Sequence, residues 1–228
     1  MKSKKIKVIM GVIILILIIG IISILYINKD NSTKDEKKFK EEYESINEKS
    51  KISLTIPEDN KMKYVTSKEV IDILKNKTGV IYFGFPDCPW CRNIVPILIN
   101  TAKCECLDQI YYFNALSIRD IKHLDESGNI VTDKKGSKEY YEIVELLSDY
   151  LGVYEGLNDD SIKRLYFPTV VFVKDGRVVD VHISTVEDQT DPYVPLTKKQ
   201  QEKLQQEYKE GISKMESNVC DFNKKTSC

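Results

Sequence analysis

Cys88 and Cys91 are the residues of this 228-residue chain whose types and spacing point most directly to chemistry. They enclose Pro89 and Trp90 in a Cys-Pro-Trp-Cys motif. An apolar run at 80–85 precedes the motif and a helical pattern follows it, which predicts a strand, a turn and a helix that starts at the dithiol. A thiolate at a helix start faces unpaired N–H groups and the positive end of the helix dipole. Both lower the cysteine pKa, and the thiolate is the reactive form.

The spacing of the two cysteines predicts different roles for them. Cys88, at the helix start, is expected to be the exposed nucleophile, and Cys91, one turn deeper, the thiol that resolves a mixed disulfide. Residues at positions i and i+3 share one helix face, as this exchange requires. The alternatives are an inert structural dithiol and one half of a zinc site.

Two further landmarks accompany the motif. Pro96 lies five residues after Cys91, and segment 167–179 reads Phe-Pro-Thr-Val-Val-Phe-Val-Lys-Asp-Gly-Arg-Val-Val. Together with the dithiol they resemble the active site of the thioredoxin superfamily over roughly residues 55–215, in particular that of membrane-anchored bacterial thioredoxin-like proteins, the bacteriocin-accessory type included. The resemblance implies an α/β thioredoxin fold, in which a mixed central sheet carries helices on both faces.

The same resemblance implies a substrate-binding set. Pro168 is expected to follow a cis peptide bond and to pack against the dithiol, while the backbone of Phe167 pairs with an extended substrate strand. Pro89 and Trp90 are expected to form an apolar contact patch beside Cys88. The alternative for Pro168 is an ordinary trans proline at the start of an edge strand.

The chain departs from the family pattern at three positions. Tyr82 stands where many thioredoxins have a buried aspartate. Asp87 replaces a tryptophan, and its charge is expected to oppose thiolate formation at Cys88, whereas Arg92 is expected to favour it. The dipeptide between the cysteines matches neither reducing thioredoxins nor strongly oxidising relatives and is closest to that of glutaredoxins. The redox direction therefore stays open.

Four cysteines lie outside the motif, namely Cys104, Cys106, Cys220 and Cys228. An even number of additional cysteines is typical of structural disulfides in an oxidising compartment. In the implied fold the dithiol helix and the last helix run in the same direction on one sheet face, so we expect the first two cysteines to pair with the last two. A second redox pair, zinc binding together with the dithiol and a local bridge within the C-terminal tail are the alternatives. No metal site and no cofactor are expected.

The N-terminus carries a candidate membrane anchor. Four lysines precede an apolar run from Val8 to Ile27, which is long enough to cross a bilayer as a helix. We expect an uncleaved anchor, with a cleaved signal peptide as the alternative. The domains expected are the anchor at 1–28, a charged tether with a short helix at 29–50, the thioredoxin-like domain at 51–217 with an insertion at 118–163, and a cysteine-containing tail at 218–228.

The dithiol must be positioned by the elements around it, which spacing and turn signals predict. Thr66 with Glu69 indicates a helix N-terminus, as does Thr197 for the last helix. Asp175-Gly176 indicates a hairpin. The other expected elements are a helix with Phe39 and Tyr43 docking on the domain, strands at 51–56, 80–85 and 110–116, and a helix at about 140–151.

The sequence predicts a membrane-tethered thiol–disulfide oxidoreductase that acts outside the cytoplasm on cysteines of exported proteins. It would need electrons from a membrane reductase or, in the other direction, an oxidant. With 34 basic and 35 acidic residues mixed along the chain, no nucleic-acid footprint is present. The rival hypothesis is a non-enzymatic accessory module that binds an exported peptide or a membrane partner.

Two further expectations concern the rest of the domain. The insertion is expected to contribute to substrate choice, with Tyr154, Glu155 and Tyr166 as candidate contacts. The two histidines, His123 and His182, are expected to face solvent.

Overall fold

A five-stranded mixed sheet forms the centre of the molecule, in the strand order β1-β3-β2-β6-β7. The computed structural model describes residues 13–20, 23 and 33–215. β1 and β2 each pair with β3 in parallel, whereas β6 is antiparallel to both β2 and β7. The strands are β1 (Met62–Tyr64), β2 (Gly79–Phe83), β3 (Ile110–Phe113), β6 (Thr169–Lys174) and β7 (Arg177–Ile183).

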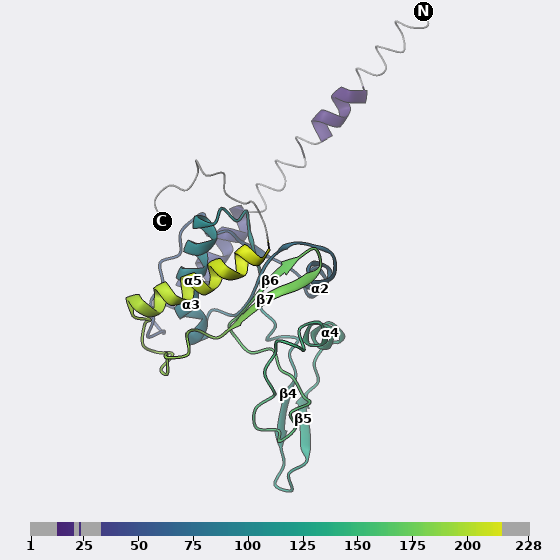
Figure 1. The fold of residues 1–228 in the computed structure, drawn as a ribbon, viewed down its shortest axis with the longest axis vertical. Coiled ribbons are helices and arrows are strands. Elements are labelled where there is room, and N and C mark those ends of the chain that lie inside the picture. The colour runs from purple at the N-terminus through teal and green to yellow at the C-terminus, as the bar shows by residue number, and fades with distance from the viewer. Residues whose placement is uncertain (1–12, 21–22, 24–32, 216–228) are drawn as a thin grey trace, which may run out of the picture.

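Helices cover both faces of this sheet (Figure 1). Helix 33–44, α3 (Pro89–Cys104) and α5 (Lys198–Lys214) lie on one face, and α2 (Ser67–Asn76) and α4 (Lys138–Leu146) on the other. Alternate strand residues supply the two cores. On β2, Val80 and Tyr82 pack with the first helices, and Ile81 and Phe83 with the second. The expected α/β class, a mixed central sheet with helices on both faces, is confirmed.

The helix caps and the hairpin turn that the sequence predicted are present at the predicted residues. Thr66 and Glu69 form a complete capping box at the start of α2, and Thr197 opens α5 in the same way. Asp175 and Gly176 have φ values of +48° and +71° and turn β6 into β7. Two successive positive φ values suit a two-residue hairpin, because the twist of such a turn matches that of the flanking strands.

The expected first strand at 51–56 is absent; the first strand of the sheet is β1. Alternate side chains of the segment are buried, but it pairs with no strand. Its backbone is satisfied by side chains instead: the Asn47 amide bonds both N–H and C=O of Leu54, and the Glu44 carboxylate accepts from the Ile56 N–H. Alternating burial therefore did not indicate sheet pairing.

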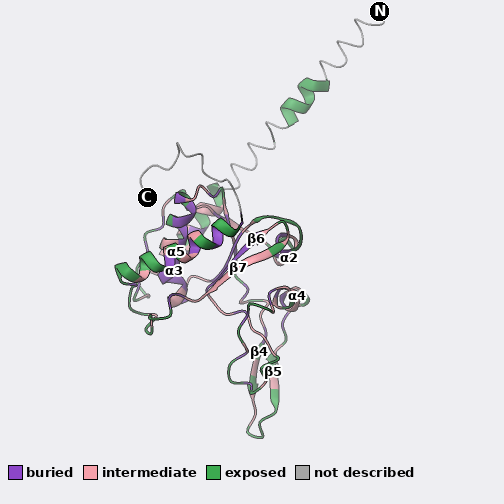
Figure 2. Ribbon diagram, viewed as in Figure 1, coloured by how far each residue is buried: buried purple, intermediate pink, exposed green. Residues whose placement is uncertain are grey.

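The insertion forms an arm that leaves the central sheet. β4 (Ile121–Leu124) and β5 (Ile130–Lys134) pair antiparallel in a separate two-stranded sheet. Figure 1 shows this hairpin projecting away from the domain, and Figure 2 shows that its residues are intermediate or exposed. α4, which follows the hairpin within the insertion, packs on the sheet and buries Tyr140 and Ile143. The expected helix in the insertion is confirmed, but the sequence did not predict the hairpin.

The N-terminal region is described only in part. Helix 33–44 docks on the domain as expected, with Phe39 and Tyr43 fully buried. Across 13–20, 23 and 33–215, no helix has the length and apolar character needed to cross a membrane. The rest of the expected anchor, at 1–12, 21–22 and 24–28, lies outside the described residues, so the anchor stays a prediction.

Candidate active site

Cys88 occupies the N-cap of α3, directly after the loop that follows β2. Pro89 takes the first helical position, where its missing N–H leaves no bond unmade and its ring favours helical φ. The Cys91 N–H donates to the Cys88 Sγ at 3.2 Å. The cysteine sulfur thus accepts the capping hydrogen bond that a serine or aspartate oxygen usually accepts.

The surroundings of Cys88 favour its thiolate. A hydrogen bond from the Cys91 thiol, helped by the backbone N–H groups of Cys91 and Trp90, lowers the pKa of Cys88, although burial acts in the opposite direction. The side chain is more enclosed than expected, with 5% of its surface exposed. The expectation of an exposed Cys88 is therefore wrong: the thiol has a lowered pKa and is almost entirely enclosed.

Cys91 lies behind Cys88 and is completely buried. Burial raises the pKa of Cys91 well above its usual value, and the hydrogen bond to Cys88 adds to this effect. The pKa values of two thiols one helical turn apart are thus shifted in opposite directions, so Cys88 loses its proton more readily than Cys91. This is the asymmetry expected of an attacking and a resolving cysteine.

The Phe167–Pro168 peptide bond is cis, as predicted, and it faces the dithiol. The Cys88 thiol donates to the Phe167 carbonyl across 3.7 Å, which joins two segments 79 residues apart in the sequence. Among the described residues, the Phe167 N–H has no hydrogen-bond partner. One backbone donor beside the reactive sulfur is therefore free to bind another chain.

Aromatic side chains surround this contact. The Phe167 ring meets Phe85 edge to face at 5.5 Å, and the Arg119 guanidinium, at the base of the arm, lies 5.0 Å from the Phe167 ring. Trp90 is half-buried against the core of the α3 face. These aromatic side chains lie beside the dithiol, and the insertion contributes Arg119 to them. The contact patch expected of Pro89 and Trp90 stays a prediction.

Arg92 and Asp87 do not act on Cys88 as expected. Arg92 is fully buried and points away from the sulfur: its guanidinium donates to the carbonyls of Ile52, Tyr43 and Pro86. Asp87 is exposed, and neither residue is among the groups that set the pKa of Cys88. Arg92 follows Cys91 in sequence, but this did not reveal where its side chain points. The backbone carbonyls that accept its hydrogen bonds determine that direction.

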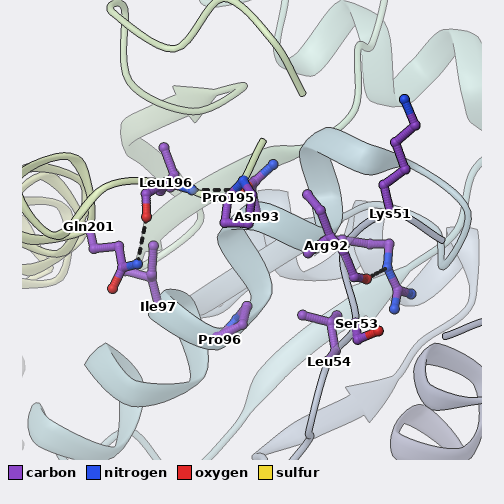
Figure 3. Close-up of a pocket in the computed structure, with 11 residues that line it drawn as sticks. Lys51, Ser53, Leu54, Arg92, Asn93, Pro96, Ile97, Pro195, Leu196 and Gln201 are labelled. Atoms are coloured by element: carbon purple, nitrogen blue, oxygen red, sulfur yellow. Dashed lines mark hydrogen bonds between the residues drawn. The ribbon is translucent and has the colours of Figure 1, made fainter. Parts of the chain in front are cut away.

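A pocket of about 250 Å³ lies beside α3 (Figure 3). Segment 51–54, Arg92 to Ile97 and segment 195–201 form its walls, and the dithiol does not line it. Its polar side chains are already engaged: Asn93 accepts from the Leu196 N–H, and Gln201 donates to the Leu196 carbonyl. The pocket lies where these three segments pack together, and it is separate from the dithiol site.

Two tyrosines complete the floor of the site, and one was missed from the sequence. Tyr82 on β2 and Tyr43 on helix 33–44 are fully buried, and their hydroxyl oxygens are 2.9 Å apart. Both tyrosines lie in the same buried core as Cys91. The helical spacing that predicted the docking of Tyr43 gave no sign that its hydroxyl would bond that of Tyr82.

The additional cysteines are separate from the dithiol. Cys104 and Cys106, at and after the end of α3, are disulfide-bonded, whereas Cys88 and Cys91 are free. The first pair therefore supplies no thiolates for a zinc ion. The expected partners Cys220 and Cys228 lie outside the described residues, so the connectivity stays a prediction. The described residues contain no group of three or more His, Cys, Asp or Glu side chains suited to a metal ion.

The histidines differ from each other. His123 is exposed on the arm and contacts Asp133. The expectation that His182 faces solvent is wrong: its ring packs edge to face on Tyr208 at 5.3 Å, and burial lowers its pKa. Strand alternation placed it correctly on one face of β7, but α5 covers that face.

The expected contacts in the insertion also change. Tyr154 is buried, and its hydroxyl bonds the backbone of Lys122, while the Tyr166 hydroxyl bonds Val153 and Glu155. Both tyrosines therefore hold the arm together internally.

Compared with known proteins, the chain matches no family model and no curated protein sequence.

Proposed function

We propose that the protein is a thiol–disulfide oxidoreductase with a thioredoxin-like fold, in which Cys88 attacks and Cys91 resolves. The observation that carries the proposal is the contact of the Cys88 thiol with the carbonyl of the cis Phe167–Pro168 bond, 3.7 Å away, while Cys91 lies buried behind it. The strand order, with two parallel and two antiparallel pairings in one sheet, agrees with that fold.

The chemistry follows from the two thiols. The Cys88 thiolate attacks one sulfur of a substrate disulfide, and the second substrate sulfur leaves with the bonding electrons. Cys91 then displaces the bound sulfur, so that the Cys88–Cys91 disulfide forms as the substrate becomes a dithiol. The reverse sequence oxidises a substrate dithiol. Phe167, with a free N–H beside Cys88, would hold an extended substrate segment by a backbone hydrogen bond.

The proposed setting is the outer side of a cell membrane, with exported proteins as substrates and a membrane electron donor or an oxidant as redox partner. The disulfide bonding of Cys104 and Cys106 supports an oxidising compartment, where such bonds persist. The apolar run at 8–27 supports a membrane tether.

A turnover assay tests the proposal. The full-length chain, purified in mild detergent, should accelerate the reduction of insulin disulfides by dithiothreitol, and Cys88→Ser should remove the acceleration. Equal turnover in wild type and Cys88→Ser would contradict the assignment of Cys88. No turnover by the wild type, together with binding of an extended peptide, would favour the non-enzymatic module instead.

A further inference from the structure

Two arginines at the base of the arm lie against the aromatic side chains that precede the cis proline. The Arg119 guanidinium is 5.0 Å from the centre of the Phe167 ring, and the Arg164 guanidinium is 5.7 Å from that of the Tyr166 ring. Arg164 also lies 4.0 Å from the Tyr154 ring. Because Tyr166 and Phe167 are consecutive in sequence, the two cations lie beside the same short segment of the site.

Both guanidinium groups keep their hydrogen-bond donors free. Contact with a ring face uses the positive charge of a guanidinium but leaves its N–H groups available for another partner. Within the described ranges, neither arginine side chain forms an ion pair or donates a hydrogen bond, and the buried Nε of Arg164 has no partner. Asp120, next to Arg119 in sequence, is buried with its carboxylate 3.6 Å from the Lys122 ammonium. The base of the arm therefore carries two positive charges without a bound carboxylate.

These donors lie within reach of a chain that is held at Cys88. The Cys88 thiol donates to the Phe167 carbonyl across 3.7 Å, and the Phe167 N–H is free among the described residues. An extended chain advances about 3.3 Å per residue. A substrate segment that bonds this N–H therefore brings the residues one or two positions from its cysteine to the Phe167 ring and to the guanidinium groups beside it.

We propose that Arg119 and Arg164 form a carboxylate subsite, and that the protein prefers substrates with an aspartate or glutamate within two residues of the reactive cysteine. The inference rests on the function proposed above and names its substrate class. Burial lowers the pKa of Arg119, and the positive charge of Arg164 adds to this effect. A carboxylate bound at the two groups would offset their repulsion and accept charge-assisted hydrogen bonds from their N–H groups. Both side chains are half-buried, so solvent screens such a pair less than it screens one on the open surface.

Short peptides with an uncharged leaving group test this preference. Each peptide is blocked at both ends, carries glutamate, glutamine or lysine on both sides of a single cysteine, and has that cysteine joined to 2-thiopyridine in a mixed disulfide. Cys88 of the reduced full-length chain, in mild detergent, attacks the peptide sulfur. The bond to Cys88 forms as the bond to thiopyridine breaks, and the thiopyridine leaves with the electron pair, takes a proton and is measured by its absorbance.

We expect the glutamate peptide to react about three- to thirtyfold faster than the glutamine peptide at low salt, between the usual effects of an exposed ion pair and of a charge-assisted hydrogen bond. The lysine peptide should be the slowest, and molar salt should reduce the differences. Arg119→Gln and Arg164→Gln should each bring the glutamate-to-glutamine ratio towards one. Arg119→Lys should keep most of the ratio, because it keeps the charge.

Arg177→Gln is the matched control, because Arg177 is exposed and pairs with Lys174 at the end of β6 that is remote from Pro168. It should keep the wild-type ratio. The double variant Cys88→Ser/Cys91→Ser corrects for any other thiol, and reaction with the glutamine peptide shows that a variant is folded.

Equal rates for the three peptides in the wild type would overturn the inference, as would a wild-type ratio in both Arg119→Gln and Arg164→Gln. An equal loss of the ratio in Arg177→Gln would show an effect of overall charge and no subsite. Faster reaction of the lysine peptide would also overturn it and would indicate that substrates meet Asp87, the exposed acid before Cys88. Absence of thiopyridine release by the wild type from every peptide would refute the proposed function itself.

Discussion

At the scale of single residues, the site depends on what touches each of two sulfur atoms. Cys88 receives hydrogen bonds and has a lowered pKa, while burial raises that of Cys91. The motif and its flanks were sufficient to predict these roles. They were not sufficient to predict that Arg92 bonds the Tyr43 carbonyl or that the Tyr43 hydroxyl bonds that of Tyr82, because both contacts depend on helix 33–44, which lies far from the motif in sequence.

Gly84 provides a prediction at this scale. Gly84→Ala should displace the Tyr82 ring, because the new Cβ would lie 2.2 Å from the hydroxyl oxygen of a ring that has no room to move. We expect a loss of about 1–3 kcal/mol in the free energy of unfolding, as for other overpacked cores, measured by urea denaturation. Gly152→Ala is the control, since the nearest atom to its Cβ, on Tyr166, is 4.0 Å away. Equal stability of the two variants would contradict the packing described.

At the scale of elements, α3 is held to the N-terminal part of the domain by Arg92. Its guanidinium bonds the carbonyls of Tyr43, Ile52 and Pro86, so one side chain joins helix 33–44, segment 51–56 and the active-site loop. The spacing of apolar residues along the sequence does not indicate that Arg92 makes these hydrogen bonds. A sequence can indicate which side chains of segment 51–56 are buried, but only the fold determines that side chains and not a neighbouring strand satisfy its backbone.

Arg92→Lys tests these hydrogen bonds. A lysine ammonium cannot reproduce the planar fork of donors, so buried carbonyls would lose their partners. We expect a loss of about 2 kcal/mol or more in the free energy of unfolding. Arg177→Lys, at an exposed position on β7, should change stability little. The account of α3 would be wrong if the two substitutions had the same effect.

The junction of β7 and α5 predicts a pH dependence. Burial lowers the pKa of His182, and this outweighs the opposing effect of Asp180; Glu207 lies 3.3 Å away, and Lys203 also disfavours the charge. The unfolded chain therefore binds a proton more readily than the folded one. This contribution to stability is complete above the ordinary histidine pKa of about 6.5 and is lost as the pH falls below it.

His182→Gln should remove that loss. Urea midpoints measured at about pH 8 and about pH 5 should then differ less than in the wild type, whereas His123→Gln, on the exposed arm, should preserve the wild-type difference. A wild-type pH dependence in His182→Gln would show that other groups are responsible.

At the scale of the whole molecule, the arm formed by the insertion is the feature whose structure the sequence predicted least well. The sequence predicted a helix within the segment 118–163, and α4 confirms it, whereas the β4–β5 hairpin was not predicted. The base of the arm reaches the site through Arg119 and the Phe167 ring. Its outer part presents Ile121 and Ile130, which are 47% and 39% exposed.

We therefore expect the arm to contact bound substrates. A photo-crosslinking residue placed at Ile130 in the Cys91→Ser variant should capture a substrate that is held on Cys88. The same residue at Glu210, an exposed position in the last turns of α5, should not. Capture from Glu210 with no capture from Ile130 would place substrates on the opposite side of the domain.

The most direct test of the central claim is to trap the intermediate itself. In the full-length chain Cys91→Ser should accumulate mixed disulfides through Cys88, because attack proceeds and resolution cannot. Cys88→Ser should accumulate none, because Cys91 is buried and keeps its proton. Mass spectrometry of non-reduced protein, after acid quenching, identifies the cysteine that carries the adduct. Adducts on Cys88 in the first variant alone are the predicted result; adducts on Cys91 in the second, or none in either, would contradict the account.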